Sequence, residues 1–244
     1  MTIGDGALEI NADHLPQGDQ KRAAVREMFD AIAPRYDLVN RIMTFRMDVG
    51  WRRRTVRALD LAPGGQVLDL ACGTGDFCVE LAAGGLRPVG SDLSFGMLQA
   101  ARTDAPLMHA DALALPVADD SVDGVTCGFA LRNLVELEGF FDEVARVVRP
   151  GGRVAFLEVA EPPNLIMRWG HGVYFGRVVP WIGGKLSDPA AYRYLPKSVA
   201  YLPEPDVLLR SLRSHGFANA QHRLFSGGIA QLFVATRDRR LPDR

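Results

Sequence analysis

Between residues 63 and 160, short apolar segments alternate with segments of helical character, and this alternation limits the possible folds more than any other feature. The apolar runs predicted to be strands are residues 66–72, 87–92, 106–111, 122–128 and 152–160. Between them, helices are expected to begin near Gly75, Ser94 and Glu138. Nearly continuous apolar strands that alternate with helices form a parallel sheet covered on both faces. The sequence therefore predicts an α/β fold with a doubly wound, mostly parallel sheet.

The residues before this region predict helices. Over residues 25–32, apolar side chains recur at the spacing of one helical face, and this helix is expected to end before Pro34. Residues 49–60 predict a second helix. Both belong to the N-terminal helices at 21–62, the first part of a single domain that continues to the C-terminus at residue 244. Residues 1–20 show no periodic pattern and are expected to be a loose leader.

Two kinds of segment follow the core, which spans residues 63–161. Residues 162–200 combine aromatic side chains with several glycines and prolines, which predicts an irregular helical insertion. Residues 201–238 predict a C-terminal helix and two strand-like runs, at 217–225 and 231–236. A Ser-Gly-Gly turn separates these two runs, so we expect them to pair antiparallel at the edge of the sheet.

The overall composition argues against several classes of protein. The 244 residues carry a formal net charge of −1 and a pI of about 6.5, which gives no electrostatic basis for binding nucleic acid. The sequence has no run of about 18 apolar residues that would span a membrane, and the N-terminus does not resemble a signal peptide. Because the three cysteines and the histidines lack metal-ligand spacing, we predict reduced thiols in a cytoplasmic protein and no metal site.

The most informative motif is the segment from Asp69 to Asp76, which follows the first strand directly and leads into a helix. Gly73 and Gly75 flank Thr74, and two glycines around one residue let the backbone turn tightly and approach a ligand without obstruction by Cβ atoms. In an open parallel sheet, this turn lies at the carboxyl ends of the strands, where ligands bind. The motif therefore predicts a ligand site.

Three carboxylates indicate which ligand this site binds. Asp92 ends the second strand as an exposed carboxylate, at the position where an acidic residue accepts hydrogen bonds from a ribose diol. Asp111 follows the third strand and can face an adenine amino group, and Asp69 can orient an ammonium group near the glycines. Together they suit a ligand with a ribose, an adenine and an amino-acid tail but no phosphate. That description fits S-adenosylmethionine.

Two other interpretations of the turn remain. A dinucleotide site requires the pattern G-x-G-x-x-G, but Cys78 occupies the third glycine position and no basic residue lies at the turn to bind a pyrophosphate. The other alternative is a structural turn whose aspartates only cap helices. The set of carboxylates at strand ends favours the methyl donor over both.

With these residues placed, the chain resembles the class I, Rossmann-like methyltransferases and, more narrowly, the ubiquinone/menaquinone C-methyltransferases of the UbiE/MenG type. The resemblance extends from about residue 25 to the C-terminus. The segments that carry it are residues 29–30, 33–40, 69–76, 131–133, 147–152, 192–196 and 226–230. Two departures accompany it. Residues 92–109 form a shorter connection than is usual in the family, and Ala130 stands where the family has glycine.

The resemblance implies an activity, a cofactor and a set of binding residues. The implied contacts to S-adenosylmethionine are Gly73, Thr74, Gly75, Asp92, Asp111 and Ala112. The implied reaction is carbon methylation of a prenylated quinol, most closely demethylmenaquinol or a ubiquinol precursor, by a cytoplasmic protein that visits the inner face of the membrane. A methyltransferase for another small hydrophobic acceptor, or a catalytically silent scaffold that binds S-adenosylmethionine, are the alternatives.

Arg132, Asn133 and Tyr36 are the candidate catalytic residues. A quinol carbon is a weak nucleophile until a ring hydroxyl loses its proton, so the site needs a proton acceptor and a group that stabilises the phenolate. Arg132 stays charged and offers several donors, Asn133 can position a water or the ring oxygen, and Tyr36 can donate to the substrate. A loop salt bridge is the alternative role for Arg132, and a core aromatic residue the alternative for Tyr36.

Two further segments carry expectations about the substrate and the membrane. Residues 162–200 are expected to form an apolar groove for the isoprenoid tail, or else ordinary core over one face of the sheet. His171, within them, is a candidate base, although a lone histidine in such a segment is more often simply packed. The run Arg52–Arg54 is expected to be a solvated helix face, with attraction to a membrane surface as the less favoured interpretation.

Overall fold

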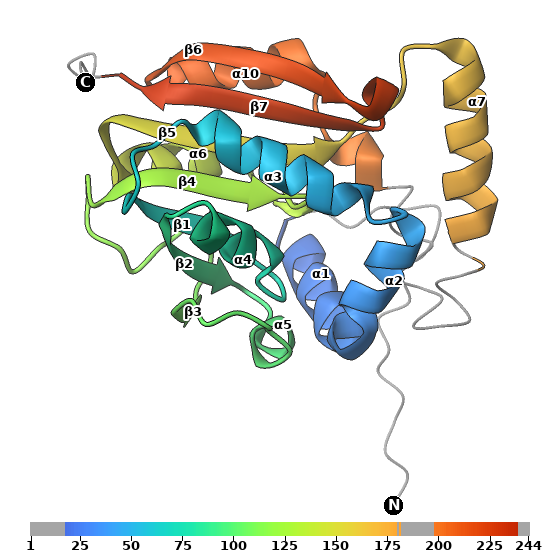
Figure 1. Ribbon diagram of the computed structural model, residues 1–244, viewed down its shortest axis with the longest axis horizontal. Coiled ribbons are helices and arrows are strands. Elements are labelled where there is room, and N and C mark those ends of the chain that lie inside the picture. Colours follow the sequence, from blue (N-terminus) through green and yellow to red (C-terminus); the bar gives the residue numbers. More distant parts are fainter. Residues whose placement is uncertain (1–17, 180, 182–197, 239–244) are drawn as a thin grey trace, which may run out of the picture.

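The computed structural model describes residues 18–179, 181 and 198–238 of the chain. This part of the chain contains a seven-stranded sheet in the order β3-β2-β1-β4-β5-β7-β6 (Figure 1). The strands are β1 Gln66–Leu70, β2 Arg87–Asp92, β3 Leu107–His109, β4 Val122–Gly128, β5 Val148–Val159, β6 Phe217–Phe225 and β7 Ala230–Arg237. Strands β1 to β5 pair in parallel, whereas β7 lies antiparallel between β5 and β6. The predicted doubly wound sheet and its antiparallel C-terminal pair are confirmed.

Helices cover both faces of this sheet (Figure 1). Helices α3 and α4 pack against one face, and α6 and α10 against the other. The α-helices are α1 Gly18–Ile32, α2 Tyr36–Met43, α3 Met47–Leu59, α4 Asp76–Ala83, α5 Phe95–Gln99, α6 Leu137–Val147, α7 Leu165–Val173 and α10 Pro205–Ser214. Shorter helical turns are η1 Ala33–Arg35, η2 Leu131–Asn133, η3 Tyr174–Val178, η4 Val199–Tyr201 and η5 Ser226–Gly228.

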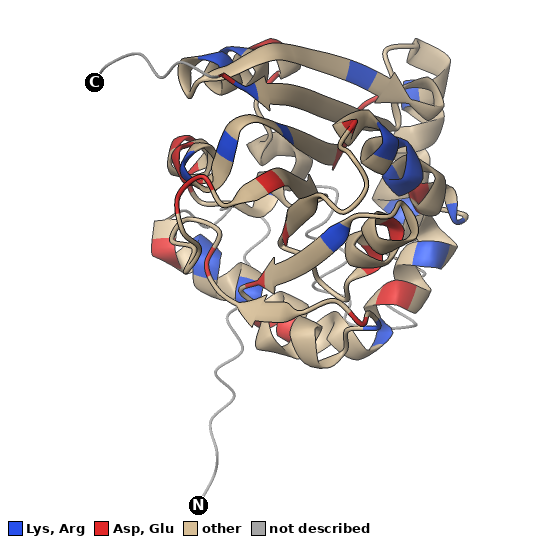
Figure 2. Ribbon diagram, turned by 60° about the vertical axis from the view of Figure 1, so that its left-hand side comes forward, with Lys and Arg blue, Asp and Glu red and all other residues tan. Residues whose placement is uncertain are grey.

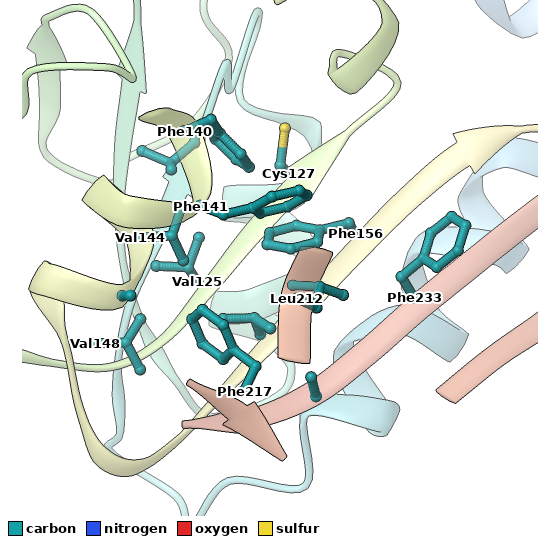
Figure 3. Packing of buried hydrophobic residues seen from close by; sticks show 14 of the residues in the cluster. Val125, Cys127, Phe140, Phe141, Val144, Val148, Phe156, Leu212, Phe217 and Phe233 are labelled. Carbon is teal, nitrogen blue, oxygen red and sulfur yellow. The ribbon is translucent and has the colours of Figure 1, made fainter. Parts of the chain in front are cut away.

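The core consists of a layer of apolar side chains on each face of the sheet. Successive residues of a strand point to opposite faces; accordingly, Val154 and Phe156 of β5 pack with α6 and α10, whereas Ala155 and Leu157 pack with α3. Figure 3 shows the first of these layers, in which aromatic rings from α6, β5 and β6 lie together. Truncation of one of these buried phenylalanines to alanine removes roughly 3–5 kcal/mol of stability.

A third, smaller cluster of apolar residues joins α1, α2 and α5 near the carboxyl ends of the strands. Its buried members include Met28 and Ile32 of α1 and Met97 of α5. Asp30 adds a polar link, because its carboxylate accepts hydrogen bonds from the Ser94 hydroxyl at 2.5 Å and from the backbone N–H of Gly96 at 2.9 Å. These contacts hold α1 over the edge of the sheet where ligands bind in such folds.

Several boundaries differ from the sequence-based expectations. Helix α1 begins at Gly18, so residues 18–20 belong to it and not to the leader. Helix α2 was not predicted, and β5 begins at Val148 because residues before the glycine turn already pair with β4. Within the expected insertion, α7 and the π-helical turn η3 stand apart from the sheet (Figure 1). The segment 192–196, which contributed to the resemblance, lies outside the described residues.

Candidate active site

The glycine turn after β1 has the backbone conformation that its sequence predicts. Gly73 and Gly75 adopt φ angles of +57° and +88°, in the left-handed region where residues with a Cβ atom are strained. A Cβ atom on Gly75 would also lie 2.5 Å from Cγ2 of Thr103. Helix α4 starts directly after this turn, so its first N–H groups and the turn face the carboxyl ends of the strands.

Asp92 anchors the turn from the neighbouring strand. Its carboxylate accepts hydrogen bonds from the backbone N–H groups of Gly73 at 2.7 Å and of Ser94 at 2.8 Å. Burial raises the pKa of this carboxyl, while these backbone hydrogen bonds oppose the rise. The expectation of an exposed carboxylate with little structural role is therefore wrong, because Asp92 closes the junction between the glycine turn and the start of α5.

Asp111 lies beyond the end of β3 and pairs with a residue of α1. One of its oxygens accepts a hydrogen bond from the N–H of Leu113 at 3.0 Å, and the other lies 3.0 Å from a guanidinium nitrogen of Arg22. The side chain of Arg22 is 48% exposed, so this ion pair lies at the rim of the site. It gives α1 a direct contact with the proposed adenine end.

These residues surround a cavity with about 860 Å³ of non-atom space, part of it open to solvent. Gly73, Asp92, Asp111 and Ala112 all line it. Apolar residues of α1, α5 and the β4–η2 segment complete the wall: Val25, Phe29, Met97, Phe129, Ala130 and Leu134. Carboxylates beside an apolar slot fit the ribose and the flat base of S-adenosylmethionine.

Two basic residues of α1, Arg22 and Arg26, also line this cavity. No basic residue lies at the glycine turn in the sequence, and these two come from a distant part of the chain. Arg22 faces Asp111, which neutralises its charge. Over the molecule, basic and acidic residues are interspersed in the view of Figure 2.

The other residues predicted at the cofactor site lie behind the cavity wall. Asp69 is buried, and its carboxylate accepts hydrogen bonds from the Thr126 hydroxyl at 2.7 Å and from Sγ of Cys78 at 3.7 Å. Burial raises the pKa of Asp69 to about 7. Thr74 is also buried and donates to Asp37 of α2 at 2.5 Å. In this structure the side chains of Asp69 and Thr74 thus form hydrogen bonds within the protein next to the glycine turn.

A second cavity adjoins the first, with about 1,790 Å³ of non-atom space that is also partly open to solvent. Its described walls come mainly from α2, α3, α7 and η3 and are largely apolar: Ile32, Met43, Phe45, Met47, Trp51, Met167, Tyr174, Phe175 and Ile229. Tyr36 and Phe129 line both cavities. The two cavities therefore adjoin at these two rings.

Tyr36 has the properties of a hydrogen-bond donor at this junction. Burial raises its pKa to about 12, although the positive charges of Arg52 and Arg132 oppose the rise. Its hydroxyl therefore keeps its proton at neutral pH. Tyr36 can donate to a ring oxygen but does not act as a base.

Arg132 and Asn133 are adjacent in sequence but face different cavities. Asn133 lines the first cavity, whereas Arg132 lines the second. The buried guanidinium of Arg132 pairs with Glu158 of β5 and donates to the Phe129 carbonyl at 2.7 Å and to the Ser198 hydroxyl at 3.0 Å. Its Nη2 atom makes none of these contacts. Arg132 therefore forms a salt bridge, which was the alternative role considered for it, and it also lines the second cavity.

The burial of two charged residues that shape this region, Glu158 and Arg52, was not predicted from the sequence. Glu158 is fully buried and forms an ion pair with Arg132. The feature of the sequence that could have indicated this role is a carboxylate within an otherwise apolar strand. Arg52 was expected on a solvated helix face, which is wrong: it is buried, pairs with Asp48 and Asp76, and lies 5.6 Å from the centre of the Phe129 ring. Asp48 lies four residues before Arg52 on the same helix, α3, whereas the contacts with Asp76 of α4 and with Phe129 come from other elements and are not revealed by a local pattern.

Comparisons with known proteins agree with this geometry. Residues 17–237 match the ubiE/COQ5 methyltransferase family. Demethylmenaquinone methyltransferase of Roseiflexus castenholzii is 45% identical, over 91% of this chain and 97% of that protein. The ubiquinone/menaquinone biosynthesis C-methyltransferase UbiE of Syntrophotalea carbinolica is 39% identical, over 93% and 98%. A SAM-dependent methyltransferase of Thermotoga maritima has a TM-score of 0.63 at 16% identity, over 87% of this chain and 99% of that one, which shows the shared fold.

The sheet order, the glycine turn, the carboxylate at the end of β2 and the carboxylate beyond β3 define a class I, S-adenosylmethionine-dependent methyltransferase. The predicted fold class, enzyme class and cofactor are confirmed. More narrowly, the chain belongs to the ubiE/COQ5 methyltransferase family.

Proposed function

We propose that this protein methylates a ring carbon of a prenylated quinol, most closely demethylmenaquinol, in menaquinone or ubiquinone biosynthesis. The observation that carries the proposal is the junction of the two cavities at Tyr36 and Phe129. One cavity has the carboxylates that suit the methyl donor, and the other is lined largely by apolar residues. The similar proteins of Roseiflexus castenholzii and Syntrophotalea carbinolica are named for quinone methylation, which supports this class of acceptor.

On the donor side, S-adenosylmethionine supplies an electrophilic methyl group. We assign Asp92 to the ribose hydroxyls and Asp111 with Ala112 to the adenine, because all three line the first cavity. Gly73 admits the ligand close to the backbone. Thr74 and Gly75 keep the turn in shape, and the predicted contact of Asp69 with the ammonium group remains part of the proposal.

On the acceptor side, the residues of this chain orient the ring and stabilise the charge that develops on its oxygen. Arg132 holds a permanent positive charge in the second cavity, and Tyr36 offers a hydroxyl donor at the junction. Asn133 on the first wall can position the ring oxygen or a water. A ring bound against the apolar wall displaces water, which strengthens each of these electrostatic contacts.

The protein must reach a substrate that resides in a bilayer, and we propose that α7 contacts the membrane surface from the cytoplasmic side. Leu165, Ile166 and Trp169 of α7 are 76%, 81% and 74% exposed, and Trp181 is 62% exposed. In the described part of the chain, none of the helices is long and apolar enough to span a membrane. A short helix with exposed apolar side chains can bind at the membrane–water interface without spanning the bilayer. Ile166→Ser with Trp169→Ser should reduce co-sedimentation with anionic liposomes, whereas Val207→Ser on α10 should not.

The deciding experiment incubates purified protein with S-adenosylmethionine and either demethylmenaquinol or a demethylated benzoquinol of short tail. Mass spectrometry should detect a gain of one methyl group on the ring of the quinol. In cells that lack the gene, the lipid quinones should lack this methyl group. Transfer only to a different hydrophobic acceptor would replace the proposed substrate. Cofactor binding without any transfer would favour the silent scaffold.

A further inference from the structure

Helix α7 has an unusual distribution of side chains. Every residue from Leu165 to Val173 is exposed except His171, which is partly buried. An ordinary surface helix turns its apolar residues inward and its polar residues outward. Here the apolar Ile166 and Trp169 face solvent, and the one ionisable imidazole turns toward the protein. The packing of apolar side chains against the protein does not explain why His171, and not Ile166 or Trp169, faces inward.

The imidazole of His171 lines the second cavity, together with Tyr36 and Arg132. The centre of its ring lies 4.3 Å from that of Phe175, which fixes the ring plane. Its Nε2 atom is buried and has no hydrogen-bond partner among the described residues. A buried nitrogen without a partner is costly unless a ligand or water satisfies it. The position of Nε2 therefore suits a proton that arrives with the substrate.

From this geometry we infer that His171 accepts the hydroxyl proton of the acceptor ring. The inference rests on the proposed function, because it requires an acceptor with an acidic ring hydroxyl. The O–H bond breaks, the proton moves to Nε2, and the electron pair on oxygen raises the nucleophilicity of the ring carbon. The new carbon–carbon bond forms as the methyl–sulfur bond breaks. The ring then loses its C–H proton to water and recovers its hydroxyl proton from His171, so one proton is released in total.

The other titratable groups on the described wall of this cavity are less suited to the role. Arg132 stays protonated, and the pKa of Tyr36 lies near 12. Tyr174 already donates its hydroxyl proton to the carbonyl of Met43 at 2.8 Å, and burial raises its pKa. Glu161 is exposed to solvent, unlike the buried Nε2 atom of His171. Burial lowers the pKa of His171, against the opposing charge of Glu161, so the ring is neutral and able to accept a proton at pH 7.

The test compares wild-type protein with His171→Gln, His171→Ala and Glu161→Gln, using S-adenosylmethionine and a short-tail demethylmenaquinol. Loss of a general base lowers the rate by roughly 10²–10⁴-fold, and we expect a fall of that size in kcat for both His171 variants. S-adenosylmethionine affinity and melting temperature should stay unchanged. The acidic limb in the pH profile of kcat/KM should disappear, and added imidazole should restore part of the activity of His171→Ala.

Three outcomes separate the possibilities. Full activity of His171→Gln, with methylation of the quinol by wild-type protein, would overturn the role of His171 and leave the proposed function standing. Loss of activity and of the acidic limb in Glu161→Gln alone would transfer the role to Glu161. Absence of quinol methylation by wild-type protein would overturn the proposed function and this inference with it.

Discussion

Replacement of Glu158 by alanine tests the electrostatic design of the acceptor cavity most directly. Glu158 is fully buried and lies against the guanidinium of Arg132, and it also accepts a hydrogen bond from the N–H of Val159 at 2.8 Å. Its removal leaves a buried positive charge without a counter-charge. Breaking such a pair costs about 3–5 kcal/mol. For a chain of this size, each kcal/mol lowers the melting temperature by roughly 2–4 °C, so we expect a decrease of roughly 6–20 °C.

Urea denaturation and calorimetry measure this loss, and two control variants define its origin. Arg53 and Glu80 form an ion pair of 3.0 Å in which the side chain of Arg53 is 63% exposed, so Arg53→Ala should cost less than about 1 kcal/mol through loss of the pair. The double variant Arg132→Met with Glu158→Leu should cost less than the sum of the single losses, because neither charge is then left alone.

Activity separates the two roles of Arg132. If its guanidinium stabilises the phenolate, Arg132→Lys should lower kcat on the order of a hundredfold, with little change in S-adenosylmethionine affinity. A loss of less than about 1 kcal/mol of unfolding free energy in Glu158→Ala would refute the claim that this variant leaves the buried charge of Arg132 without a counter-charge. Normal turnover in a folded Arg132→Lys variant would reduce Arg132 to the partner of Glu158 in a structural ion pair.

Three further predictions follow from the donor cavity. Asp92→Ala should weaken S-adenosylmethionine binding by roughly 1.5–3 kcal/mol in calorimetry and should also lower the melting temperature, because the N–H groups of Gly73 and Ser94 lose their acceptor; unchanged affinity would remove Asp92 from the site. Asp69 has a folded-state pKa near 7, above its ordinary value of 3.8, so its contribution to stability is greatest below pH 4 and is lost as the pH rises through 7. The stability of Asp69→Asn relative to wild type should therefore rise over that pH interval, by at most about 4 kcal/mol. A stability difference that stays constant between pH 4 and 8 in denaturation experiments would contradict the raised pKa of Asp69. A large loss of S-adenosylmethionine affinity in Asp69→Asn would support the predicted contact of Asp69 with the ammonium group. S-adenosylhomocysteine should raise the melting temperature and NADH should not, and the reverse result would contradict the assignment of the cofactor.

The sequence alone determined the sheet and the position of the donor site. Apolar runs and turn residues act over a few neighbouring positions, so β2 and β4 were predicted with their observed bounds. The ends of parallel strands meet at one edge of a sheet, which places Asp92 and Asp111 beside the glycine turn once the strand order is known.

Only the tertiary structure decided which charges are buried and which cavity each residue faces. Arg132 and Asn133 are sequence neighbours, yet the turn η2 directs them to different walls. Glu158 is buried against Arg132 of another element, and Arg52 is buried between Asp48 of its own helix and Asp76 of α4. Charged side chains favour water unless a distant partner compensates them, so no local pattern reveals their burial. The junction at Tyr36 and Phe129 joins segments more than ninety positions apart, and it exists only in the folded chain.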